Sequence, residues 1–335
     1  MDVRYTIILS YPVLDSGMYE DAADAIGKLS LFIMGDKRVD TLMSTVPDTE
    51  FINKCTSACA GCSSDLILRH VLKAAGPDTV LVVPACCTSV LQGVYPNTSF
   101  GIPVYNVAFA AAAAVASGMA AAFEELGKKT NVIAYAGDGG TVDIGIQALS
   151  GALERGTNFL YICYDNEAYG NTGMQRSGST PLGARTTTTP GGKIHAKKDL
   201  DRIIAAHHLP YMATGCSAYP QDLVRKVEKA LSIKGPKFMH ILAPCPPGWR
   251  YDASKTIEIG KLAVRTGIWA MYEREYDTLT LSGQTKAAMM KPAPLEEYLK
   301  MQGRFSGLKE DQISEIRASM ERNLRLLKRE ADDTC

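Results

Sequence analysis

Residues 131–180 constrain the fold more than any other part of the chain. Two apolar runs of strand length, 132–136 and 158–164, flank a segment whose apolar residues recur at spacings of three and four, as in a helix. The recurring residues are Ile144, Ala148, Leu149 and Leu153. A strand–helix–strand unit with a right-handed crossover makes its two strands parallel. The sequence therefore predicts an α/β fold with a mostly parallel sheet.

Polar residues follow both predicted strands at the point where each strand ends. Asp138 stands among Gly137, Gly139 and Gly140, and Asn166 comes 28 positions after Asp138. In open α/β sheets ligands bind outside the carboxyl ends of the strands. Carboxylate and amide oxygens suit Mg²⁺, while glycines and a helix N-terminus favour a phosphate. This pattern predicts a magnesium diphosphate site; the alternative is an ordinary turn in which Asp138 caps a helix.

Cysteines form the second strong pattern. Cys59 and Cys62 make a C-x2-C pair, whereas Cys86 and Cys87 follow the predicted strand 79–85, and Cys245 follows another strand in a proline-rich turn. Thiolates gathered from distant segments suit either a structural zinc ion or a [4Fe–4S] cluster. The spacing alone leaves both possibilities open.

Two motifs resemble a known family. GDG followed by Asn166 after one βαβ unit resembles the thiamine diphosphate fingerprint, and DNEAYGNTGMQRSGSTPLGA is similar to the β subunit of pyruvate:ferredoxin oxidoreductase and its 2-oxoacid relatives. The resemblance extends from about residue 55 to about residue 305. It implies the thiamine diphosphate-binding fold, with helices on both faces of the sheet.

The resemblance also implies which residues hold thiamine diphosphate and its Mg²⁺. Asp138, Asn166 and the main-chain carbonyl of Ala168 correspond to the magnesium ligands. Asn171 corresponds to a catalytic residue beside the thiazolium ring and the substrate. The full set of implied cofactor-binding residues is Gly137, Asp138, Gly139, Gly140, Asn166, Ala168, Asn171 and Thr172.

For the cysteines, the resemblance favours the cluster over zinc. The family holds a [4Fe–4S] cluster through positions that match Cys59, Cys62, Cys87 and Cys245. The sequence departs from the family at Cys86, where glycine is usual, and at the additional Cys55. Either of these two cysteines competes as a ligand, and Cys86 is the alternative to Cys87.

The implied activity is the oxidative decarboxylation of a 2-oxo acid, with electrons leaving through the cluster and the acyl group usually passing to coenzyme A. Pyruvate is the default substrate. Gly170 replaces the methionine of the family's YMNTG motif, and this change favours a wider pocket for a bulkier acid such as phenylglyoxylate; oxalate is a further alternative. An α subunit supplies the pyrimidine half-site, and γ-type and ferredoxin-like δ-type subunits or domains complete the enzyme.

Two other functions are compatible with parts of the pattern. A non-redox thiamine diphosphate decarboxylase or synthase subunit needs GDG and Asn166 but not four converging cysteines. A zinc-stabilised binding subunit needs the cysteines but leaves GDGG, Asn166 and the NTG of 171–173 without purpose. The combination of both patterns favours the oxidoreductase.

Composition bounds the remaining possibilities. The formal net charge of zero gives no argument for a nucleic-acid or membrane partner, and nine cysteines without a leader peptide predict a cytoplasmic protein. The longest apolar tract, 104–123, is alanine-rich and is interpreted as a buried helix rather than a membrane span.

The chain is divided on sequence grounds into three parts. Residues 1–50 are an N-terminal extension, 51–265 the α/β domain that binds both cofactors, and 266–335 a helical tail. The segment 177–200 is rich in Gly, Ser, Thr and Pro and predicts a long loop that carries a solvated His195. His240 and Cys163 lie within predicted strands and are interpreted as core residues.

Overall fold

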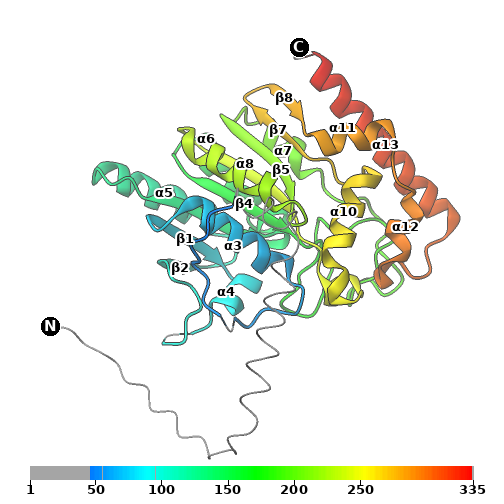
Figure 1. Ribbon diagram of the computed structural model, residues 1–335, viewed down its shortest axis with the longest axis horizontal. Helices are drawn as coiled ribbons and strands as arrows, with labels where there is room; N and C mark the ends of the chain where they lie inside the picture. Colours follow the sequence, from blue (N-terminus) through cyan, green and yellow to red (C-terminus); the bar gives the residue numbers. More distant parts are fainter. Residues whose placement is uncertain (1–45, 55, 95, 334–335) are drawn as a thin grey trace, which may run out of the picture. The chain divides into compact units, whose positions relative to one another are not determined.

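An eight-stranded sheet organises the computed structural model, which describes residues 46–54, 56–94 and 96–333 (Figure 1). The strand order is β2-β1-β3-β4-β6-β5-β7-β8. The parallel part consists of β1 (Thr79–Pro84), β2 (Val104–Val107), β3 (Asn131–Gly137), β4 (Leu160–Asp165), β5 (Tyr211–Cys216) and β6 (Lys237–Leu242). The prediction of a mostly parallel sheet is confirmed.

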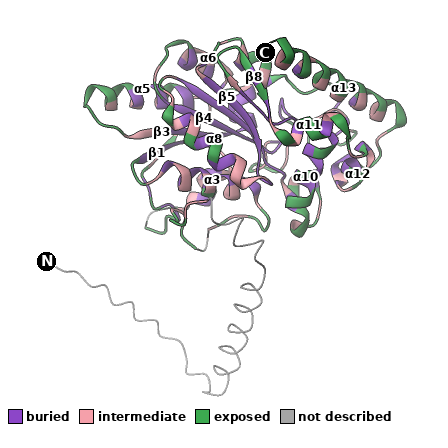
Figure 2. Cartoon of the chain, turned by 45° about the horizontal axis from the view of Figure 1, so that its top comes forward, coloured by how far each residue is buried: buried purple, intermediate pink, exposed green. Residues whose placement is uncertain are grey.

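Helices cover both faces of this sheet, as predicted. One core lies between the sheet and α3 (Ser63–Ala75), α4 (Cys87–Gln92) and α8 (Pro220–Ser232). The other lies beneath α5 (Ala112–Glu125), α6 (Ile146–Glu154) and α7 (Leu200–Ala205). The central strands β4, β5 and β6 are buried at every position, which explains their continuous apolar sequences (Figure 2).

The register of the strands brings four predicted site segments to one edge of the sheet. Gly137 of β3 pairs with Tyr164 of β4, and Asp165 of β4 pairs with Leu242 of β6. Asp138, Asn166 and Cys245 therefore leave the sheet close to one another, and Cys86 and Cys87 leave it after β1. This carboxyl edge is the place where ligands bind in open α/β sheets.

Two local predictions were wrong. The apolar tract 104–123 is not one buried helix, because Val104–Val107 forms the edge strand β2 and α5 begins only at Ala112 and buries one face. Ile144, expected to face the core, is 48% exposed, because the chain continues from β3 through a π-helical turn, η1 (Gly139–Asp143), before α6 begins.

The segment after residue 265 is not purely helical, which corrects the predicted helical tail. Its strands β7 (Tyr272–Glu275) and β8 (Thr278–Leu281) extend the sheet, with β7 antiparallel to β5 and β8 antiparallel to β7. Its helices are α11 (Gly283–Met290), α12 (Leu295–Lys300), the 3-10 turn η3 (Gly303–Phe305) and the long α13 (Glu310–Asp333). With α9 (Pro246–Trp249), η2 (Ala253–Lys255) and α10 (Thr256–Thr266), these elements enclose a third core around Trp249.

The described helices include none with the length and apolar character needed to span a membrane. The predicted N-terminal extension 1–50 lies outside the described residues except for 46–50.

Candidate cofactor and iron–sulfur site

Asp138 gives the clearest indication of a ligand, because its carboxylate is buried and only one of its two oxygens has a hydrogen-bond partner. The side chain is 1% exposed, and Oδ2 accepts a hydrogen bond of 2.5 Å from the Ser177 hydroxyl. Oδ1 has no hydrogen-bond partner among the described residues. Asp138 also makes no capping hydrogen bond to η1, contrary to the simple turn interpretation. A buried carboxylate oxygen without a hydrogen-bond partner is typical of a metal ligand whose cation is not bound.

Electrostatics at Asp138 lead to the same conclusion. Burial first, and then the neighbouring Asp165 carboxylate, raise the pKa of Asp138 well above its usual value. A divalent cation at Oδ1 would reverse this shift, because it favours the ionised carboxylate.

The glycines around Asp138 have a packing role that the sequence did not reveal. A Cβ atom at Gly139 would lie 2.3 Å from the ring of Tyr169, and one at Gly140 would lie 3.1 Å from the ring of Phe109. Aromatic rings thus pack directly on this backbone. These glycines therefore allow aromatic side chains to pack closely on the backbone, in addition to favouring a phosphate.

Asn166 and Ala168 lie in a buried turn directly after β4, on the side of the sheet edge next to Asp138. Their exposed fractions are 7% and 8%. The Asn166 side-chain Oδ1 accepts from the Ala168 N–H at 3.3 Å, and the Asp165 Oδ1 accepts from the Glu167 N–H at 2.9 Å. Glu167 between them adopts a left-handed conformation with φ of 61°, which reverses the chain within one residue.

Asn171 and Thr172 lie at the tip of the next turn and are exposed. Backbone hydrogen bonds in both directions between Tyr169 and Gln175 hold the base of this turn. The Thr172 hydroxyl donates to Gln175 Oε1, so it is occupied within the turn. Asn171 lines the same pocket as Asn166.

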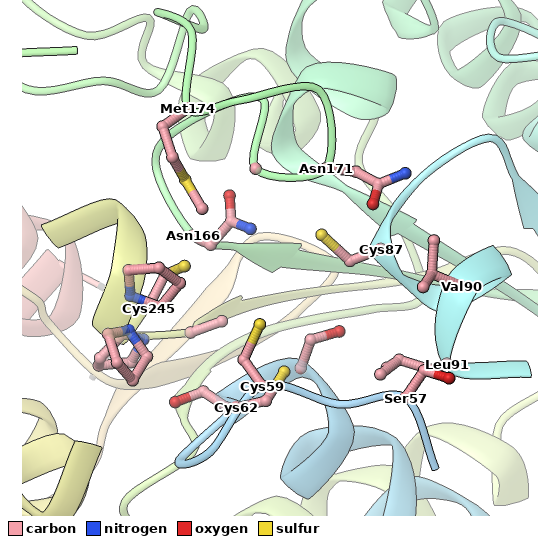
Figure 3. A pocket seen from close by; sticks show the side chains of 17 residues that line it. Ser57, Cys59, Cys62, Cys87, Val90, Leu91, Asn166, Asn171, Met174 and Cys245 are labelled. Atoms are coloured by element: carbon pink, nitrogen blue, oxygen red, sulfur yellow. The ribbon is translucent and has the colours of Figure 1, made fainter. Parts of the chain in front are cut away.

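The four predicted cysteines line one pocket, shown in Figure 3 with their side chains around a common space. The cavity measures about 230 Å³ and is also lined by Asn166, Gly170, Asn171 and Met174. Cys59 and Cys62 come from the turn before α3, Cys87 from the first turn of α4, and Cys245 from the residue before α9. The sequence thus brings together segments that are up to 186 residues apart (245 minus 59).

The environment of these thiols opposes their ionisation. Burial raises the pKa of Cys87 and of Cys245 to about 12, and it also raises the pKa of Cys62. Metal coordination deprotonates a thiol outright. The hydroxyl oxygen of Ser63, which is 2% exposed and lines this pocket, has no hydrogen-bond partner among the described residues. Coordination to a metal would therefore be needed to ionise these thiols, and the Ser63 hydroxyl can donate to a group bound in the pocket.

The cysteine side chains are not gathered around one point. Within the described part of the chain, no three His, Cys, Asp or Glu side chains are close enough to hold one metal ion. Zinc requires all four sulfur atoms at ~2.3 Å from a single centre. A four-iron cluster attaches each thiolate to a different iron atom and so needs the sulfur atoms farther apart.

Cys86 occupies a different position from Cys87. It is the N-cap of α4, where its carbonyl accepts from the Ser89 N–H at 3.1 Å and the Ser89 hydroxyl accepts from the Cys86 N–H at 3.4 Å. Cys87, not Cys86, lines the cavity. Cys55, the other competing cysteine, lies outside the described residues.

Gly170 lies where the two halves of the site meet. A Cβ atom at this position would be 3.1 Å from Asn166 Nδ2 and 3.3 Å from Cys87 Sγ. A side chain here would therefore enter the space between the cofactor turn and a cluster cysteine.

Sequence reasoning missed a buried network behind the Asn166–Ala168 turn. His240 is 4% exposed, as expected for a core residue, but its Nε2 lies 2.9 Å from Asp165 Oδ2 and its Nδ1 lies 2.8 Å from Asp201 Oδ1. Although burial opposes protonation, the two carboxylates raise the pKa of His240 to about 9. The imidazolium thus holds Asp165, which in turn holds the Glu167 N–H.

Other predicted residues take the positions expected of them. His195 is exposed on its loop, and Cys163 is fully buried in β4. The loop 177–199 contains no helix or strand, but it is packed rather than solvated near Asp138. The Lys193 ammonium, on a side chain 2% exposed, donates to the carbonyls of Ser177, Gly178 and Thr180.

Comparison with known proteins identifies the family. Residues 85–241 match the C-terminal TPP-binding domain of the thiamine pyrophosphate enzymes. The pyruvate synthase subunit PorB of Methanocaldococcus jannaschii is 49% identical over 294 residues, which cover 84% of this chain and 97% of that protein. The ketoisovalerate oxidoreductase subunit VorB of Pyrococcus abyssi is 48% identical over 80% of this chain and 89% of that protein. The chain belongs to the family of 2-oxoacid:ferredoxin oxidoreductase β subunits.

A solved structure agrees with this assignment at the level of the fold. A 2-oxoglutarate:ferredoxin oxidoreductase from Magnetococcus marinus has a TM-score of 0.56 and 19% identity, covering 82% of this β subunit and 97% of that chain. The predicted family, fold class and oxidoreductase class are therefore confirmed, and the chain carries a thiamine diphosphate-binding domain as one subunit of a multi-subunit enzyme.

Proposed function

We propose that this β subunit oxidatively decarboxylates a 2-oxo acid at a site that combines Mg²⁺–thiamine diphosphate with a [4Fe–4S] cluster. One observation carries the proposal: Asn166 and Asn171, expected beside the thiamine cofactor, line the same cavity as Cys59, Cys62, Cys87 and Cys245. Decarboxylation chemistry and a one-electron outlet are thus adjacent.

In this reaction the bond between the carboxylate and keto carbons breaks and CO₂ leaves. The acyl carbon loses two electrons, which pass singly to two oxidised ferredoxins or similar acceptors. The acyl group forms a thioester with coenzyme A, and the thiol proton is released. When bound, thiamine diphosphate supplies the electron sink that makes the decarboxylation possible.

The chain's own residues have distinct roles in this proposal. Asp138 Oδ1, Asn166 and the Ala168 carbonyl hold Mg²⁺, and Ser177 orients Asp138 through its hydrogen bond. Gly137, Gly139 and Gly140 shape the backbone next to the diphosphate. Asn171 orients the oxygen atoms of the substrate, with Thr172 fixing the turn that carries it.

The cysteines provide the electron outlet. Cys59, Cys62, Cys87 and Cys245 hold the cluster, and Cys86 remains a helix cap. An α subunit contributes the pyrimidine half-site, and γ-type and ferredoxin-like δ-type subunits complete the complex in the cytoplasm.

The test is spectroscopic and uses the complete complex purified without oxygen. We expect visible absorption of an iron–sulfur cluster, with bleaching and a paramagnetic signal when the correct 2-oxo acid is added. Pyruvate, branched 2-oxo acids, phenylglyoxylate and oxalate are compared. A colourless protein that contains zinc would contradict the cluster assignment and favour a non-redox thiamine enzyme.

We further propose that Gly170 widens the substrate range. The absence of a side chain leaves open the space between Asn166 and Cys87 that a Cβ would enter. Gly170→Met should reduce kcat/KM for branched and aromatic 2-oxo acids by more than about tenfold relative to pyruvate, as expected when bulk enters a pocket. Iron content measured on the same sample separates a narrowed pocket from a lost cluster. An equal loss for all acids, with iron retained, would contradict this role.

A further inference from the structure

Arg304 is a buried arginine that contacts both halves of the site although it comes from the C-terminal part of the chain. It lies in η3 and is 2% exposed. Its Nη2 lies 2.7 Å from Glu167 Oε2, and its Nε donates to Gln302 Oε1 at 2.9 Å. The guanidinium is thus paired in charge with Glu167, whose Oε2 makes no hydrogen bond among the described residues, and hydrogen-bonded to Gln302; a buried charge is costly without such partners.

The contact with Glu167 reaches the cofactor turn. Glu167 is 5% exposed, and its backbone stands between Asn166 and Ala168 in the left-handed conformation. Its carboxylate lies between two cations, Arg304 at Oε2 and Lys197, whose Nζ lies 3.4 Å from Oε1. The Arg304–Glu167 ion pair therefore connects η3 to the turn that presents Asn166 and Ala168, two of the three proposed magnesium ligands.

The second contact reaches the cluster loop. The guanidinium carbon of Arg304 lies 3.7 Å from the centre of the Trp249 ring, at cation–π distance. The Trp249 backbone N–H donates to the carbonyl of Cys245, and its indole N–H donates to the Asn166 carbonyl at 2.8 Å. Trp249 is thus tied to a proposed cluster ligand at one end and to the cofactor turn at the other.

We propose that Arg304 is a positioning residue that couples the two halves of the site. Through Glu167 and Trp249 it fixes the Asn166–Ala168 turn relative to the Cys245 loop, so that occupation of one half stabilises the other. This inference rests on the proposed function. Coupling of this kind is reciprocal and is measurable as a change in one site when the other is filled.

The experiment measures how fast an iron chelator bleaches the cluster absorption of the complete complex, with and without Mg²⁺ and thiamine diphosphate. We expect the thiamine cofactor to slow bleaching by at least about 5-fold in the wild type, the lower end of typical coupling between sites. In Arg304→Met the protection should fall towards 1-fold. Arg317→Met is the matched control, because Arg317 pairs with Glu296 in the same C-terminal part and is 41% exposed.

Two further variants keep the test decisive if Arg304→Met does not assemble. Glu167→Gln removes the partner charge at nearly constant volume, and Trp249→Phe removes the indole N–H that donates to Asn166. Each should reduce the protection while retaining the cluster. Unchanged protection in all assembled variants would overturn the role of Arg304. A wild-type complex without cluster absorption or without thiamine binding would instead overturn the proposed function itself.

Discussion

The two halves of the site differ in how far the protein alone determines their geometry. The cofactor half is closed: Asp138, Asn166 and Ala168 are all less than a tenth exposed, the Ser177 hydroxyl donates to Asp138, and the Glu167 N–H donates to Asp165. The cysteine half is open. Cys59 is exposed, and Cys62, Cys87 and Cys245 are partly exposed around a cavity.

This difference indicates which half of the site depends on its bound group for its geometry. At Asp138, Oδ2 is held by Ser177 and Oδ1 has no hydrogen-bond partner among the described residues, so we infer that a cation would complete a site whose other side is already formed. Around the cysteines the protein supplies walls and raised thiol pKa values, but nothing that draws the four sulfur atoms together. We therefore expect the cluster to organise its loops, whereas thiamine diphosphate enters a prepared site.

The strongest test of the open half compares two adjacent cysteines. Cys87→Ala should lose the cluster absorption and reduce electron transfer to ferredoxin to background, because one of four ligands is missing. Cys86→Ala should keep both, because Cys86 caps α4 and does not line the cavity. Iron content and reduction of ferredoxin are measured on both complexes. The opposite outcome for the two variants would exchange their roles.

The matching test of the closed half is Asp138→Asn. It should weaken binding of Mg²⁺–thiamine diphosphate by more than about 100-fold, beyond the cost of removing an outer partner of a metal site. The cluster absorption should persist, because Asp138 does not line the cysteine cavity. Calorimetric titration of the complex measures the affinity, with the exposed Asp78→Asn as control. Loss of both cofactors together would show that the halves do not assemble separately.

We expect the free energy of unfolding to depend on pH, because His240 is paired with Asp165 and Asp201 beneath the closed half. The folded-state pKa of His240, about 9, lies above its usual value of 6.5. Its stabilisation is therefore complete below about pH 6.5 and is lost as the pH rises to about 9. The loss of stability is at most about 3 kcal/mol.

The melting temperature of the wild type should fall over this pH interval, and His240→Gln should make this fall smaller. A parallel decrease in both proteins would rule out His240 as the cause, and the exposed His195→Gln serves as the control.

The smallest effect is expected at Ser177. Ser177→Ala removes the 2.5 Å hydrogen bond to Asp138 Oδ2 but leaves both oxygens of the carboxylate in place. Affinity for Mg²⁺–thiamine diphosphate should fall by about tenfold, the usual cost of losing one outer partner. Ser179→Ala, another buried serine in the same turn, is the comparison variant. Equal affinities for the two variants would contradict an orienting role for Ser177.

The sequence predicted most of the fold and the composition of both halves, because local patterns carry that information. Apolar runs of strand length located β1, β3, β4 and β6, and predicted ligands follow each of these strands within a few residues. The two strands β7 and β8 were not predicted. They are four residues each; β8 alternates Thr with Leu and buries every second residue, but an alternation this short is a weak signal, and β7 contains three charged residues.

What sequence reasoning could not find are the contacts between distant segments. Arg304 lies 137 positions after Glu167, and His240 lies 75 positions after Asp165. A buried arginine in QGRF and a histidine in a strand carry no local signal of a partner. Their roles become visible only when the chain is folded, because burial and pairing are properties of the tertiary structure.

The most direct test of the account is an experimental structure of the complete complex with anomalous scattering data at the iron edge. We predict iron density bounded by the thiolates of Cys59, Cys62, Cys87 and Cys245, and a separate magnesium ion held by Asp138, Asn166 and the Ala168 carbonyl. A single zinc ion among the cysteines, or iron bound by Cys86 in place of Cys87, would contradict the division of the site into a closed cofactor half and an open cluster half.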